Sequence, residues 1–94
     1  MSSVTPDEVE RILNKLVDEL ASIEHARWAH WQAYVHDQGV RREDGSLVLP
    51  AELVSRWDLQ IATPYEELSS DEQAADRDQV MKYLPTIKRR LTEG

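Results

Sequence analysis

The chain of 94 residues contains no cysteine. This absence excludes disulfides, thiolate chemistry and cysteine-based zinc sites, and it fits a reducing compartment. No apolar run approaches the roughly 20 residues that a membrane-crossing helix needs. The first ten residues, MSSVTPDEVE, also lack the basic and apolar regions of a signal peptide. We therefore expect a cytoplasmic protein without a membrane partner.

Positive charge is also scarce. Eleven Lys and Arg residues stand against 18 Asp and Glu residues, which gives a net charge of -7. Binding to nucleic acid or anionic lipid depends on Lys and Arg side chains that displace counterions from phosphate. The one dense basic cluster, residues 88–90, lies near an expected helix C-terminus, where it faces the negative end of the helix dipole. We expect no nucleic-acid partner.

Glycine and proline are few, and they mark where helices begin and end. Thr5-Pro6-Asp7-Glu8 is typical of a capping box, and neither glycine nor proline follows before Gly39. Apolar residues recur at three- and four-residue steps: Val9, Ile12, Leu13, Leu16, Leu20 and Ile23. This spacing predicts a helix to about His36, roughly 45 Å long. A helix of that length exceeds a compact body of this size. We therefore predict that it bends, or that residues 5–22 project as an oligomerisation helix.

The rest of the chain predicts shorter elements. Asp44-Gly45 followed by the apolar residues 47–49 indicates a small hairpin or one extended segment. Pro50 can open a second helix that Thr63-Pro64 closes. A capping box at residues 69–72 opens a third helix, which Pro85 kinks or ends before a last turn or two over residues 87–91. The predicted fold is mainly α, a single small helical domain over residues 1–94 with a long N-terminal helix, a short hairpin or extended segment, and two further helices.

Aromatic residues and histidines are concentrated in residues 23–36, IEHARWAHWQAYVH. Rings three and four residues apart share a helix face, and two adjacent faces both carry rings here, so both cannot be core. Trp28 continues the apolar line of the helix, and we predict that it is buried. Trp31 stays open between core and binding site. The spacing of Trp57 with Leu53 and Ile61 favours the core, with a binding role as the alternative.

Arg27 has two interpretations. On a solvated helix face it would form an ion pair with Glu24 or Asp37. Beside aromatic rings, a guanidinium can instead stack on a base and donate a fork of hydrogen bonds to a phosphate.

Metal binding and catalysis find little support. His25, His30 and His36 are five and six residues apart, so no pair has the four-residue spacing that points two imidazoles at one ion. No carboxylate is marked out as a general acid, and helix capping explains Ser69 and Ser70. We expect no metal, no cofactor, no catalytic residue and no enzyme activity.

Three sequence motifs resemble one family. Residues 24–28, EHARW, residues 63–72, TPYEELSSDE, and residues 76–78, DRD, together resemble the ryanodine-receptor repeat (RyR) domain over residues 23–84. Family members usually carry a GWxYGPxRD-type loop between the first two motifs, whereas residues 40–61 here differ and add a helix. The resemblance implies a small, mostly helical module without established catalytic residues. It also implies a structural motif formed by His25, Trp28, Pro64, Tyr65 and Leu68, with Trp28 near Tyr65 and Leu68.

The resemblance bears on function as well. RyR domains occur in calcium-release channels and in bacterial and phage proteins associated with conflict systems, for which a role in holding nucleotide-derived signals has been proposed. We therefore predict a homo-oligomer that binds a nucleotide-derived molecule unchanged. The predicted ligand-binding residues are Arg27, His30, Trp31, Tyr34 and Trp57. If the protein is phage-encoded, it would act in the host cytoplasm as an anti-defence sponge. The alternative is a protein-interaction module whose acidic surface engages a host or partner protein. A nucleic-acid-binding role is weakened by the charge.

Overall fold

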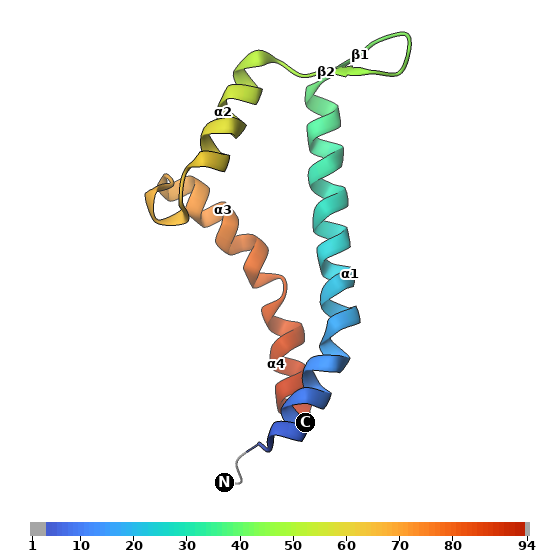
Figure 1. Cartoon of the computed structure of the whole chain (residues 1–94), viewed down its shortest axis with the longest axis vertical. Helices are drawn as coiled ribbons and strands as arrows, with labels where there is room; N and C mark the ends of the chain where they lie inside the picture. Colours follow the sequence, from blue (N-terminus) through green and yellow to red (C-terminus); the bar gives the residue numbers. More distant parts are fainter. Residues whose placement is uncertain (1–3, 94) are drawn as a thin grey trace.

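The computed structural model describes residues 4–93 and shows the mainly α fold that the sequence predicts (Figure 1). The elements are α1 (Pro6–Gln38), β1 (Val40–Arg41), β2 (Leu47–Val48), α2 (Ala51–Ala62), the 3-10 turn η1 (Tyr65–Glu67), α3 (Ser70–Met81) and α4 (Leu84–Glu93). The long N-terminal helix and the small hairpin are both present. Pro85 follows a helix break rather than kinking a continuous helix.

Local chemistry explains where α1 begins and how far it runs. The Thr5 hydroxyl accepts a hydrogen bond from the Glu8 backbone N–H at 3.2 Å, and Pro6 occupies the first turn, where no N–H is needed. The helix then continues for 33 residues and ends at Gly39. Figure 1 shows it as one rod along the long axis of the molecule. Residues 6–38 thus form one continuous helix.

Helix α4 packs on the first half of α1, residues 6–23. Ile12 and Leu16, with 6% and 3% of their surface exposed, are the only buried residues in the described part of the chain. Glu19 on α1 accepts hydrogen bonds from the Arg90 guanidinium and lies 3.2 Å from Arg89. The Arg90 guanidinium lowers the pKa of Glu19. Helix α4 therefore covers one face of the first half of α1, while Val9, Leu13 and Val17 stay exposed.

The hairpin reverses the chain at the end of α1. Val40 pairs with Val48 and Arg41 with Leu47 in antiparallel register. Gly45 has a φ of 88°, which glycine adopts without strain, and the Asp44 carboxylate accepts the Ser46 N–H at 2.9 Å. The chain then enters α2, which returns along the molecule.

Hydrogen bonds tie α2, η1 and α3 into one unit, which we call the arm. Ser69 and Glu72 form the predicted capping box, each bonding the backbone of the other. Glu72 also accepts a bond from Gln60 on α2. Tyr65 in η1 is held by Gln73, which donates to its carbonyl at 2.8 Å, and by Arg77, which donates to its hydroxyl at 3.0 Å.

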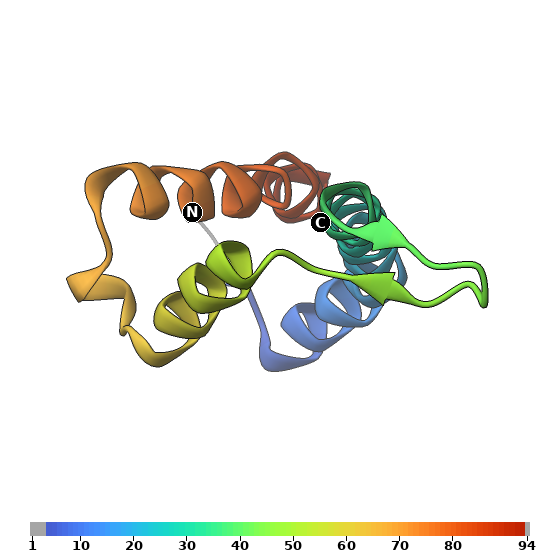
Figure 2. The same ribbon diagram turned by 90° about the horizontal axis from the view of Figure 1, so that it is seen from above.

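The molecule is open. Its radius of gyration is 18.8 Å, whereas a compact chain of this length would have about 12 Å. Figure 1 shows α4 close to α1 near the chain termini, with the arm diverging from the second half of α1, residues 24–38. Viewed from above in Figure 2, α2 and α3 lie on different sides, so α1 and the arm outline a three-sided frame. This shape leaves the ring-rich half of α1 without a packed helix.

Candidate functional site

A cleft of about 710 Å³ lies between the second half of α1 and the arm. On the α1 side it is lined by four residues: Arg27, His30, Trp31 and Tyr34. Their spacing of three and four residues places them on one face of the helix. The structure thus brings together four of the five residues that the sequence predicts for ligand binding.

The fifth residue, Trp57, contacts this group from α2. Its ring meets that of Trp31 edge-on, with centroids 5.7 Å apart and planes at 69°. Trp31 and Tyr34 are themselves 5.4 Å apart, with an angle of 30° between their planes. Both remain partly exposed, at 43% and 42%. Trp57 is half-buried and supports Trp31, while the rings of Trp31 and Tyr34 stay accessible from the cleft.

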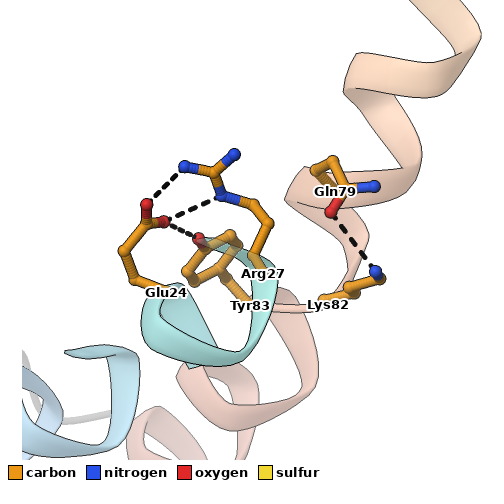
Figure 3. Close-up of polar contacts among 5 residues, drawn as sticks. All are labelled: Glu24, Arg27, Gln79, Lys82 and Tyr83. Carbon is orange, nitrogen blue, oxygen red and sulfur yellow. Dashed lines mark hydrogen bonds and ion pairs between the residues drawn. The ribbon is translucent and has the colours of Figure 1, made fainter. Parts of the chain in front are cut away.

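Arg27 forms an ion pair with Glu24 and also lines the cleft. Its guanidinium donates two hydrogen bonds to Glu24, and the Tyr83 hydroxyl donates to the same carboxylate (Figure 3). The bonds from Arg27 and then Tyr83 lower the pKa of Glu24 to about 2. Glu24 in turn raises the pKa of both Arg27 and Tyr83. The ion pair with Glu24 therefore exists, and the same side chain lines the cleft with N–H groups that Glu24 does not use.

The arm forms the opposite wall of the cleft. It contributes apolar and acidic side chains as well as amides: Gln60, Ile61, Leu68, Asp71, Glu72, Ala75, Asp76 and Gln79. Glu72 is committed to Ser69 and Gln60, whose hydrogen bonds lower its pKa. Asp71 and Asp76 are exposed carboxylates. Ile61 is 83% exposed although it lines the cleft.

Sequence reasoning missed this acidic wall. The sequence accounts for Asp71 and Glu72 as part of the capping box at residues 69–72, and for Asp76 only through the resemblance. Their positions, together with Ala75 and Gln79, recur at three- and four-residue steps along α3 and so share a face. That periodicity was the available signal, but only the tertiary structure shows that the face points toward α1.

The predicted burial of Trp28 is wrong. Its side chain is 53% exposed and is absent from the lining of the cleft. Its ring stacks on His25 at a centroid distance of 6.0 Å. The physical reason is the position of α4, which starts just after Tyr83, beside Glu24, and runs toward the chain termini. Of the other motif residues, Leu68 lines the cleft, while Pro64 and Tyr65 build the η1 corner.

Other kinds of site find no support in residues 4–93. No group of three or more His, Asp or Glu side chains there is placed to hold a metal ion. None of the helices described has both the length and the apolar character needed to cross a membrane.

Comparisons with known proteins add no relative. No family model matches the chain, and neither a curated protein nor a solved structure matches it. The resemblance to the RyR domain stays a prediction from the sequence motifs, and the cleft geometry is the basis for assigning a function.

Proposed function

We propose that the protein binds a small nucleotide-derived signalling molecule in the cleft and holds it without chemical change. The observation that carries this proposal is the single helix face that presents Arg27, His30, Trp31 and Tyr34 to one cleft of about 710 Å³. This volume falls in the range of small-molecule sites. Ring faces and a guanidinium are the groups that bases and phosphates require.

In this proposal the base stacks on Trp31, with Tyr34 beside it. Stacking of a base on an aromatic side chain contributes about 1 to 3 kcal/mol. Trp57 holds the Trp31 ring at an angle of 69°, so the ring is oriented before the ligand arrives. His30, one residue before Trp31 on the same lining, adds a donor or acceptor for the sugar or phosphate.

The charges of the cleft set the direction in which such a ligand would lie. A phosphate is attracted to Arg27 on α1 and repelled by Asp71 and Asp76 on α3. Those carboxylates accept hydrogen bonds, so they suit the N–H groups on the edge of a base. The ligand would therefore direct its phosphate toward α1 and its base edge toward α3.

If the protein is phage-encoded, holding such a molecule would withdraw an immune messenger from the host cytoplasm. This biological role follows from the sequence resemblance alone. It requires binding without turnover, so the ligand should be recovered intact.

Isothermal titration with cyclic di- and trinucleotides, ADP-ribose and cyclic ADP-ribose isomers tests the proposal. We expect saturable heat with at least one of them, a raised melting temperature through linkage, and an unchanged ligand by chromatography. Arg27→Ala should weaken binding at least about tenfold through the lost charged hydrogen bonds. The matched control is Arg41→Ala in the hairpin, which removes the same charge outside the cleft. Equal affinities of the two variants would contradict the assignment of Arg27.

The acidic wall supports a second candidate, a protein-interaction module for a basic partner. A Lys or Arg side chain could lie between the Trp31 and Tyr34 rings on one side and Asp71 and Asp76 on the other. The Glu24 carboxylate also offsets the charge of Arg27. No heat with any nucleotide, together with capture of one specific protein, would favour this candidate.

We also propose that the protein is at least a homodimer. The apolar residues of the N-terminal half form one predicted interface, namely Val9, Ile12, Leu13, Leu16 and Leu20, but Ile12 and Leu16 are buried within the single chain. Val9 and Leu13 remain exposed there. The walls of the cleft offer a larger exposed surface for such a dimer.

A further inference from the structure

The chain exposes more surface than a compact monomer should. Its accessible area is 7804 Å². A compact monomer of 10.9 kDa is expected to expose about 5,600 Å². The excess is about 2,200 Å², and a stable interface of standard size buries about 800 Å² on each partner. The surplus is thus large enough for an extensive protein interface.

The open shape accounts for this surplus. We call the two walls of the cleft the open face. Its α1 side consists of Arg27, His30, Trp31 and Tyr34, and its arm side of the lining residues of α2, Leu68 and α3. Ile61 is the most exposed large apolar residue in the described chain, at 83%, and it belongs to this face. Trp31, Tyr34 and Leu68 add further apolar surface there. A single chain leaves all of these side chains at least partly in water.

We propose that two copies of the chain pair through their open faces, so that the second half of α1 in each copy lies against the arm of the other. A two-fold pairing uses the same patch on both molecules, so the patch must be complementary to itself. The open face meets this condition, because it carries both an aromatic, basic wall and an apolar, acidic wall.

The charges of the two walls favour this arrangement over a random contact. Arg27 stands on the α1 wall, with N–H groups that Glu24 does not use, while Asp71 and Asp76 stand on the arm wall. In the paired arrangement the α1 wall of one copy meets the arm wall of its partner, which brings opposite charges together. Ile61 of each copy would leave water and pack against the α1 wall of the other, beside the ring faces that the proposed ligand uses.

The N-terminal half of α1 does not offer an equivalent surface. Its two buried residues lie on the half of α1 that packs against α4, and its exposed apolar residues, such as Val17 at 61%, lie on one helix. One helix flank cannot account for the surplus area. The pairing therefore places the cleft at the dimer interface, where the second copy supplies part of its enclosure.

Light scattering after size-exclusion chromatography tests the pairing on ligand-free protein, so its result is independent of nucleotide binding. At tens of micromolar we expect a mass of about twice 10.9 kDa. Ile61→Glu places a charge in the apolar contact and should weaken assembly at least about tenfold, giving the single-chain mass. Ile61→Leu should keep the dimer. Val17→Glu, a matched change at an exposed helical position, should also keep it.

Circular dichroism would verify that each variant is as helical as the parent. Because Ile61 is exposed in the single chain, we expect its substitutions to fold. Three outcomes would overturn the pairing. They are a single-chain mass for the parent protein, an unchanged dimer in Ile61→Glu, and dissociation by Val17→Glu as well.

Discussion

The two halves of α1 have different surroundings. The first half packs against α4, buries Ile12 and Leu16 and is joined to it by Glu19 with Arg89 and Arg90. The second half carries three of the six Trp and Tyr residues, yet it meets the arm through the contact of Trp31 with Trp57 and otherwise borders an open cleft. Rings that are exposed in this way do not stabilise the single chain as a core does. The first half therefore holds the fold, and we propose that the second half serves binding.

The largest expected effect concerns the stability that the first half of α1 provides. Leu16→Ala should lower the free energy of unfolding by about 2 to 5 kcal/mol, because it leaves a cavity where Leu16 is 3% exposed. Leu13→Ala, on the same half but exposed, should cost less than about 1 kcal/mol. Urea denaturation at one fixed protein concentration measures both. Similar costs for the two variants would show that α4 does not cover this face.

A smaller effect is expected at Trp28. The sequence predicts a core residue whose loss would unfold the domain, but the side chain is more than half exposed. Trp28→Ala should therefore cost about 1 kcal/mol or less, mainly through the lost stacking on His25. Urea denaturation of the parent and Trp28→Ala measures this cost. A cost of several kcal/mol would place Trp28 in a core that the open structure lacks.

The smallest expected effect on stability comes from Glu24, which lies where the two halves of α1 meet. Its pKa is lowered to about 2 in the folded protein, so its contribution to stability is present above its ordinary pKa near 4.5. That contribution should be lost as the pH falls from about 5 toward 2. Denaturation midpoints of the parent and Glu24→Gln should therefore converge at low pH. Tyr83→Phe removes only the hydrogen bond from the Tyr83 hydroxyl to Glu24. Its midpoint should therefore differ less from that of the parent than the midpoint of Glu24→Gln does. A constant gap between parent and Glu24→Gln over this range would refute the coupling.

Features that depend on neighbouring residues could be predicted from the sequence. The caps at Thr5 and Ser69 and the turn at Gly45 rest on contacts within a few residues, and all three occur in the structure. The common face of Arg27, His30, Trp31 and Tyr34 follows from helix geometry in the same way. The fold class and one wall of the cleft were therefore accessible without coordinates.

Features that depend on distant residues were not accessible. The Tyr83 hydroxyl donates a hydrogen bond to Glu24 across 59 positions of sequence, and no local sequence pattern predicts that contact. The exposure of Trp28 depends on the helix break between Met81 and Leu84, which decides how far α4 extends along α1. Pro85 marks that region but does not fix the direction of the next helix. The acidic wall of the cleft was missed for the same reason.

The central claim is that the exposed rings on the second half of α1 bind a ligand. Calorimetric titration of the nucleotide panel into the parent protein and Trp31→Ala tests it most directly. Trp31→Ala removes the stacking surface, which is worth about 1 to 3 kcal/mol, or roughly 5- to 150-fold in affinity. We predict saturable heat for the parent with at least one nucleotide and weakening of this size in the variant. No heat with any nucleotide, or equal affinity of parent and variant, would contradict the claim.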